Sequence, residues 1–358
     1  MVSSLFIVFC KGIYSYSSKN KTLIMKKIYL ILIFPFLLYS CSDSEGKTTF
    51  AFDNDEFDWV VEKNKVIGSL NPFQLALDPV MSRVKDIDFI SDKSIAAIVT
   101  IGDEVRIYPY QFISRFEAIN DRIGDKYFTM TYCPNTQSGL ALDRTFKTES
   151  FVLRASGYLF NENQVLLDEK TDTYWSQMLV KCIKGKYANE LNKTFNVIEM
   201  PWKLVKEYFP DALVFTNTSV ANKSNSSIKK GPIEIGDLVY GIVNFRFNLK
   251  NEVHIYEYKD FSGGTVLKKV NISGNKTLVI GNEDVHFISS YINDSNDQFS
   301  AIQNQFPIVM EDDSSNKWNV FGVAVSGPRK GDQLKSPSAF VALNWAWEEF
   351  YNDIVYQE

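Results

Sequence analysis

The sequence predicts an α+β protein that is rich in β-strands and contains two tandem copies of a unit of about 140 residues. Three observations predict this fold class. Short apolar or alternating runs outnumber helical patterns, a strand motif recurs 148 residues further along the chain, and a pair of tryptophans recurs 143 residues further along. The composition permits a packed core, because 45% of the 358 residues are hydrophobic and 23% are charged.

The repeated motif is a six-residue strand pattern. Val105-Arg-Ile-Tyr-Pro-Tyr110 matches Val253-His-Ile-Tyr-Glu-Tyr258 at four of six positions. The pairs Trp175 and Trp318, and Trp202 and Trp345, are each separated by 143 residues, and we expect all four tryptophans to lie in a repeated hydrophobic core. These matches predict a first copy at 66–216 and a second at 232–358. Residues 217–231 are rich in Ser, Asn and Lys, which is typical of a linker.

Within the first copy, the predicted strands are short runs bounded by Gly, Asp and Asn, at 95–101, 105–110, 127–132, 151–155 and 165–167. Helices are predicted at 109–120 and 201–208, where Pro opens a stretch with apolar residues at helical spacing. A third helix is predicted at 338–352, without the Pro. The sequence leaves open whether the two copies share one sheet.

The N-terminal region has the pattern of a lipoprotein signal. Two lysines precede an apolar run of about a dozen residues that ends at Cys41, so 25–40 is predicted to be a signal peptide and Cys41 the acylated residue, carrying palmitate or a similar chain. Tyr39 departs from the small residue usual in a lipobox, and an uncleaved amphipathic start is the alternative. Residues 1–24 are predicted to be a misassigned leader and 41–65 a polar tether. No later apolar run is long enough to span a bilayer.

The charge of the chain restricts its partners. It carries 38 basic and 43 acidic residues, a net charge of −5, so we expect no nucleic-acid binding. Five lysines and no acidic residue lie in 1–40, which leaves 33 basic and 43 acidic residues after processing, a net charge of −10. Because such a chain is repelled by anionic headgroups, attachment to the membrane is expected to depend on acyl chains. The expected location is the cell envelope, on the periplasmic or surface face of a Gram-negative outer membrane.

The stretch 108–215 carries a family resemblance. Its residues Asn120-Asp121, Thr131-Tyr-Cys-Pro134, Ser156-Gly-Tyr-Leu159, Asp168 and Trp175-Ser-Gln177 together resemble the bacterial domain of unknown function 3179 family. The resemblance covers nearly the whole mature chain and implies an exported or membrane-attached protein of unassigned function. The chain departs from the family pattern where His-Glu and Cys-Pro-Leu-Cys are usual, because it has Phe116-Glu117 and Cys133-Pro-Asn-Thr136.

Cys133 is the first candidate catalytic residue, since it lies at a predicted strand end before a polar turn. A thiol nucleophile needs a base or a cation nearby, and Glu117, Asp121 and Arg144 are the candidates in the first copy. Glu117 and Asp121 are four residues apart on a predicted helix and could act as paired carboxylates. The alternatives are a packed thiol, a disulfide between Cys133 and Cys182, and solvated carboxylates.

A ligand site is the other candidate, and we expect it to be lined by Tyr132, Ser138, Ser156, Asp168 and Trp175. No metal site and no cofactor is predicted, because His254 and His286 lack the paired His or Cys spacing of a zinc site. Two functions therefore remain open. One is an envelope lipoprotein that binds a small ligand or a partner protein through a cleft of the duplicated fold. The other is an enzyme that uses Cys133 as a nucleophile or redox centre.

Overall fold

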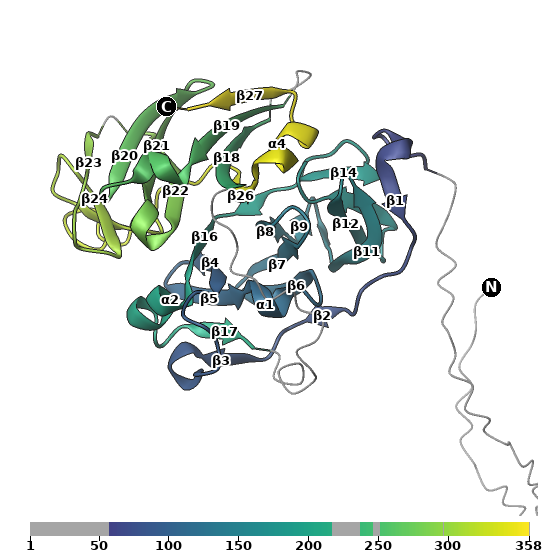
Figure 1. Ribbon diagram of the computed structural model, residues 1–358, viewed down its shortest axis with the longest axis horizontal. Helices are drawn as coiled ribbons and strands as arrows, with labels where there is room; N and C mark the ends of the chain where they lie inside the picture. The colour runs from purple at the N-terminus through teal and green to yellow at the C-terminus, as the bar shows by residue number, and fades with distance from the viewer. Residues whose placement is uncertain (1–56, 217–236, 246–250, 296, 358) are drawn as a thin grey trace, which may run out of the picture. The chain divides into compact units, whose positions relative to one another are not determined.

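The computed structural model describes residues 57–216, 237–245, 251–295 and 297–357 (Figure 1). All of them belong to one compact unit, Ala51–Glu358. The predicted leader, the signal peptide, Cys41 and the linker at 217–231 lie outside the described residues. Below, the first half means 57–216 and the second half means 237–357.

Three larger sheets form the first half, and all strand bounds follow in chain order within each sheet. One sheet has the order β16-β4-β5-β17-β3 and comprises β3 (Met81–Arg83), β4 (Ile95–Ile101), β5 (Glu104–Pro109), β16 (Val197–Pro201) and β17 (Leu213–Phe215). The second has the order β15-β8-β7-β6-β2 and comprises β2 (Ala76–Leu77), β6 (Ala118–Ile123), β7 (Lys126–Cys133), β8 (Ser138–Asp143) and β15 (Thr194–Phe195). The third has the order β1-β11-β12-β13-β14 and comprises β1 (Val66–Gly68), β11 (Leu153–Phe160), β12 (Asn163–Asp168), β13 (Thr173–Ser176) and β14 (Lys181–Lys184).

Short elements complete the first half. They are the hairpin β9 (Thr145–Phe146) and β10 (Glu149–Ser150), the helices α1 (Tyr110–Ile113) and α2 (Trp202–Tyr208), and the 3-10 turns η1 (Lys63–Lys65) and η2 (Val84–Asp86). Pro109 and Pro201 directly precede α1 and α2, where the fixed φ of proline suits the start of a helix.

The second half contains three smaller sheets. Their orders are β26-β18-β19-β27, β20-β21-β22 and β23-β24-β25. The strands are β18 (Leu238–Asn244), β19 (Glu252–Glu257), β20 (Val266–Ile272), β21 (Asn275–Asn282), β22 (Phe287–Ile292), β23 (Phe299–Ala301), β24 (Ile308–Asp312), β25 (Lys317–Asn319), β26 (Ala339–Leu343) and β27 (Asp353–Tyr356). The helical elements are η4 (Tyr258–Phe261), η5 (Glu283–Val285) and α4 (Asn344–Phe350), and α4 packs on β18 and β26 (Figure 1).

The hairpin sheets of the two halves have the same strand order. In the first half β16 pairs antiparallel with β4, β4 antiparallel with β5, and β5 parallel with β17. In the second half β26, β18, β19 and β27 pair in the same order and with the same directions. A helix follows the corresponding strand in each case, α2 after β16 and α4 after β26.

The hydrophobic core crosses from one half to the other. One buried cluster joins Ile98 and Trp202 of the first half to Tyr291 and Trp318 of the second. Another joins Trp175 to Trp347. The two halves therefore bury apolar side chains against each other, although they do not share a sheet.

The β-rich prediction is confirmed, but two predicted helices are wrong in extent. The helix expected at 109–120 ends at Ile113, because β6 begins at Ala118 and pairs with β7, and Glu117 has a left-handed φ of 57°. The helix expected at 338–352 starts only at Asn344, since 339–343 form β26. The helix expected at 201–208 is confirmed as α2.

One of the four expected core tryptophans is wrongly placed. Trp175, Trp202 and Trp318 are fully buried, whereas the Trp345 side chain is 39% exposed and the buried tryptophan of α4 is Trp347. Among the residues described, no helix has the length and apolar character needed to cross a membrane.

Candidate functional site

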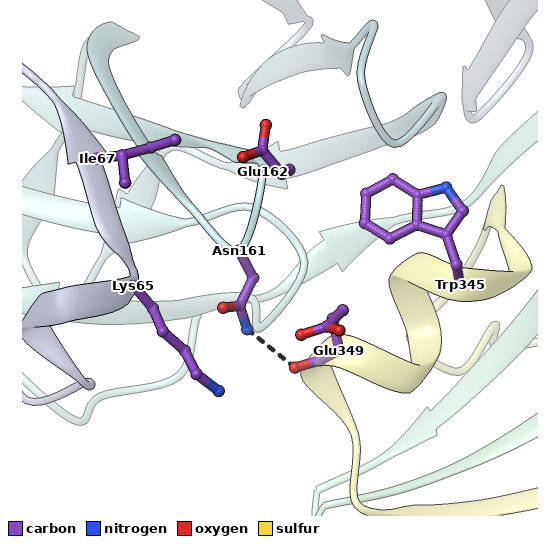
Figure 2. Close-up of a pocket in the computed structure, with 6 residues that line it drawn as sticks. All are labelled: Lys65, Ile67, Asn161, Glu162, Trp345 and Glu349. Carbon is purple, nitrogen blue, oxygen red and sulfur yellow. Dashed lines mark hydrogen bonds between the residues drawn. The ribbon is translucent and has the colours of Figure 1, made fainter.

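A pocket of about 380 Å³ lies where the two halves meet. It is called here the interhalf pocket, and it is lined by Lys65, Ile67, Asn161, Glu162, Trp345 and Glu349. Figure 2 shows Ile67 and Glu162 on one side and the indole of Trp345 on the other. Its volume lies within the range typical of pockets that hold small molecules.

A tight turn forms the part of the pocket that belongs to the first half. Asn161 and Glu162 join β11 to β12, and both have left-handed backbone conformations, with φ of 46° and 61°. Such a two-residue turn matches the twist of an antiparallel hairpin. The Asn161 amide donates a hydrogen bond to the backbone oxygen of Glu349 at 2.9 Å, so the turn is attached to α4 of the second half (Figure 2).

The chemistry of the interhalf pocket combines apolar and charged groups. The partly exposed indole of Trp345 and the exposed side chain of Ile67 offer apolar contact surface. Glu162 and Glu349 contribute carboxylates and Lys65 an ammonium group, which lies 3.2 Å from Glu62. Such a combination suits a small polar ligand with one apolar face.

A second pocket, of about 530 Å³, belongs to the first half alone and lies between the start of β5 and the turn after α2. Two of its carboxylates already have partners, since Glu104 pairs with Arg106 and Asp211 lies 2.8 Å from Lys85. The interhalf pocket is therefore the better candidate for a ligand site.

Cys133 lies beneath the interhalf pocket. Its side chain is 1% exposed, and its Sγ is 3.8 Å from the backbone oxygen of Glu162. Burial raises the pKa of the Cys133 thiol, and burial raises the pKa of Cys182 to about 12. Both cysteines are free, so the disulfide considered from the sequence is not formed in the structure.

A buried polar network surrounds the β7–β8 turn next to Cys133. Ser138 Oγ donates to Gln177 Oε1 at 2.7 Å, and the Gln177 amide donates to Thr131 Oγ1 at 2.8 Å. Asn163 donates to Thr136 and to Gln177. Because these polar groups have partners within the network, it stabilises the turn rather than presenting free groups to a ligand.

The four predicted catalytic residues do not form one centre. Glu117 lies at the same end of the β6–β7–β8 sheet as Cys133, and burial raises its pKa to about 7. Asp121 pairs with Phe128, five residues from Cys133 along β7, which corresponds to about 17 Å at the rise of a strand. Arg144 lies at that far end as well, since its backbone nitrogen donates to Tyr127.

Asp121 and Arg144 are held by protein groups at their end of the sheet. Asp121 accepts hydrogen bonds from the Tyr108 phenol at 2.6 Å and from the Arg122 nitrogen at 2.7 Å. Arg144 Nε donates to the Phe151 oxygen at 2.6 Å, and burial lowers the pKa of its guanidinium. The paired-carboxylate prediction is wrong in its geometry, because Asp121 belongs to a strand and not to a helix face.

The predicted ligand-binding residues are buried and hydrogen-bonded or packed. Ser138 belongs to the network above, and Ser156 donates to the Val165 oxygen at 2.6 Å. Asp168 accepts from Val152 and Thr171, and the Trp175 indole donates to Thr173. None of these four lines the interhalf pocket.

Tyr132 belongs to a different buried group, which centres on Glu199 of β16. Tyr110 donates a hydrogen bond to Glu199 Oε1 and stacks on Tyr132 with ring centroids 4.1 Å apart. Burial raises the pKa of Glu199 to about 8, partly offset by the bond from Tyr110, so at neutral pH the carboxyl is mostly protonated.

Sequence reasoning missed both Glu199 and the interhalf pocket. Glu199 had a signal, because it is the one charged residue in the apolar run Val197–Pro201. The pocket had none, since its lining comes from three segments far apart in the sequence. Among the described residues, no group of three His, Cys, Asp or Glu side chains could hold a metal ion, and His254 lies 2.7 Å from Glu252.

Comparison with known proteins gives one match. A family model described as "Protein of unknown function (DUF3179)" matches residues 76–354. The curated proteins and the solved structures that were compared with the chain gave no match.

Proposed function

Because that model covers most of its length, the chain belongs to the DUF3179 family of proteins of unknown function, and on this premise we propose that it is an envelope lipoprotein that binds a small ligand in the interhalf pocket. The observation that carries the binding proposal is the pocket beside Trp345, which joins residues of both halves around a partly exposed indole. The family has no assigned function that would decide between ligands.

The lipoprotein part of the proposal is supported by the sequence. The lysine pair, the short apolar run and Cys41 form the signal described above, and the acidic chain that follows favours acyl chains over electrostatic contact with lipid. The proposed partners are thus a membrane, through the lipid anchor, and a small ligand or envelope protein.

We also propose that the two halves arose by duplication. The shared strand order supports it, and the structure adds further equivalent positions. Tyr110 and Tyr258 each follow the second strand of the hairpin, 148 residues apart. Gln137 and His286 hold matching left-handed positions in the β7–β8 and β21–β22 loops, with φ of 50° and 49°.

A matched aspartate adds to this support. Asp168 ends β12 and accepts hydrogen bonds from the following turn, and Asp312 ends β24 and does the same. In each half the next strand carries a buried tryptophan, Trp175 or Trp318. On the duplication proposal the interhalf pocket is a site that neither copy could form alone.

Thermal-shift and calorimetric titration with small polar envelope metabolites tests the binding proposal. A ligand of the pocket should raise the melting temperature of the wild-type protein, and Trp345→Ala should weaken its binding by about tenfold or more because the indole provides the main apolar contact. Leu191→Ala is the matched control, since Leu191 is similarly exposed (41%) but lies outside the pocket. Equal binding by Trp345→Ala and the wild type would contradict the proposal.

The competing proposal is an enzyme that uses Cys133. It is supported by Glu117, whose pKa of about 7 suits a general base and whose carboxylate acts electrostatically on the Cys133 thiol. Against it stands the burial of Cys133, because a nucleophilic thiol needs a lowered pKa and access to its substrate.

A further inference from the structure

Five side chains meet in the buried contact between the two halves, away from the interhalf pocket. They are called here the Glu199 cluster and comprise Tyr110, Tyr132, Glu199, Tyr258 and His286. None of the five lines a pocket described above, so the inference is independent of the proposed function.

The first half contributes a carboxyl and two stacked phenols. Tyr110 donates to Glu199, and its ring lies nearly parallel to that of Tyr132, at an interplanar angle of 14°. The backbone leaves Tyr110 little freedom, because its phenol lies directly against Gly139, where the Cβ of any larger residue would overlap Tyr110 Oη. The carboxyl is thus fixed from one side.

The second half contributes a matching stack. Tyr258 and His286 have ring centroids 4.2 Å apart and an interplanar angle of 12°. His286 has a left-handed backbone conformation, which turns its ring inward, and both side chains are at least 96% buried. Tyr258 lies close enough to Glu199 and Tyr110 to interact with them electrostatically, and burial together with Glu199 raises the pKa of its phenol.

Three polar atoms of this second stack have no hydrogen-bond partner among the described residues. They are Tyr258 Oη, His286 Nδ1 and His286 Nε2. Buried polar atoms in native proteins nearly always have a partner, from the protein or from a bound molecule. Three such atoms on two adjacent rings therefore point to a bound molecule at this place.

We propose that Tyr258, His286 and Glu199 enclose a second binding site, for an uncharged guest that both donates and accepts hydrogen bonds. A phenol and a neutral imidazole offer both kinds of group, so the guest must do the same. Three unpartnered atoms match the number of hydrogen bonds that about one buried water makes, and a small neutral solute of similar chemistry is the other source.

The electrostatics of the cluster favour an uncharged guest. Burial lowers the pKa of His286 to about 4 and raises that of Glu199 to about 8, so both are mostly neutral at pH 7. An ion would lose its hydration without meeting an opposite charge there.

Tyr258→Phe tests the proposal, because it removes one oxygen and keeps the ring. If a guest occupies the site, the variant loses a satisfied hydrogen bond and its melting temperature should fall by about 2–4 °C. Tyr240→Phe is the matched control, since the Tyr240 phenol has a protein partner, Ser290 Oγ at 2.8 Å. An unchanged or higher melting temperature for Tyr258→Phe alone would overturn the proposal, because it would mean that the phenol was unpaired.

A high-resolution crystal structure of the wild-type protein gives a second, independent result. Electron density within hydrogen-bond distance of Tyr258 Oη and a His286 nitrogen supports the site. Native mass spectrometry then distinguishes the two sources, since a retained solute adds mass and water does not. An empty site, or rings that have turned to bond protein groups, would overturn the proposal whether or not the interhalf pocket binds a ligand.

Discussion

Glu199 is an acidic residue in an otherwise apolar strand, and its environment decides its charge. Water does not reach the carboxyl, and the groups that face it are the phenols of Tyr110, Tyr132 and Tyr258. None of these is a cation, so nothing compensates for the cost of ionising Glu199. The protonated form is therefore the one that the folded protein favours.

This residue makes the stability of the protein depend on pH. The pKa of Glu199 is about 8 in the folded protein against an ordinary value of 4.5, so the folded state binds the proton more tightly. Stability is then highest below pH 4.5, falls as the pH rises from 4.5 to 8, and stays reduced above 8. Glu199→Gln should remove this loss and be more stable than the wild type at pH 9, by up to roughly 5 kcal/mol.

Urea unfolding of both proteins at pH 5, 7 and 9 measures the difference. Glu117→Gln is the control, because Glu117 titrates near pH 7 in the folded protein and contributes its own slope. A difference between wild type and Glu199→Gln that does not change with pH would show that Glu199 ionises normally.

Cys133 provides the second prediction at this scale. Because its thiol is buried and its pKa is raised, we expect a thiol reagent at pH 7 to label native protein more slowly than unfolded protein, by about two orders of magnitude. The rate should be measured in a Cys182→Ser background so that one cysteine is followed. Rapid labelling of the native protein at pH 7 would favour the enzyme proposal instead.

At the scale of elements, the contact between β8 and α1 leaves no room for a side chain at Gly139. A Cβ there would meet the Tyr110 phenol, which Glu199 holds in place. Gly139→Ala should therefore destabilise the protein by about 1–3 kcal/mol beyond any effect of conformation alone.

Chemical denaturation of Gly139→Ala and of Gly124→Ala tests this expectation. Gly124 lies in the β6–β7 turn with a φ of 57° and open space around it, so its replacement costs only the strain of a left-handed alanine. Equal losses in the two variants would mean that Tyr110 moves aside easily.

The elements that the sequence predicted well are those with a clear local signal. The apolar run at 95–101 is β4, and Pro201 marks the start of α2. The helix expected after Pro109 failed because the apolar spacing of 110–113 continues into residues that pair with β7, and pairing with a distant strand outweighs local periodicity. The same reason explains why 339–343 is a strand.

The candidate site was predicted less well than the fold. Cys133 and Glu117 do lie at one end of a sheet, but the sequence could not separate them from Asp121 and Arg144, because strand pairing and not sequence distance decides which side chains meet. Trp345 was recognised as a notable residue but assigned to the core, since its neighbour Trp347 fills that place.

At the scale of the whole molecule, the shared core predicts that the halves depend on each other. Separate fragments 57–216 and 232–358 would each expose apolar surface that the other covers, including Trp202 and Trp318 in one cluster. We expect each fragment alone to aggregate or to remain unfolded.

Cleavage of the folded chain at a protease site inserted within 217–231 provides the control. The two pieces should stay together during size-exclusion chromatography, because the contacts between them do not need the linker. Elution as two separate folded pieces would contradict a shared core. The sequence predicted the boundary region of the halves from composition, but the packing of one half on the other has no local signature.

The position of β1 has a mechanical consequence. It is the edge strand of its sheet, it pairs with β11 over three residues only, and it carries Ile67 of the interhalf pocket. Tension applied to the chain upstream of β1 would peel this strand away before any other in its sheet and would open one wall of the pocket. A tug at the N-terminal side could thus release whatever the pocket holds.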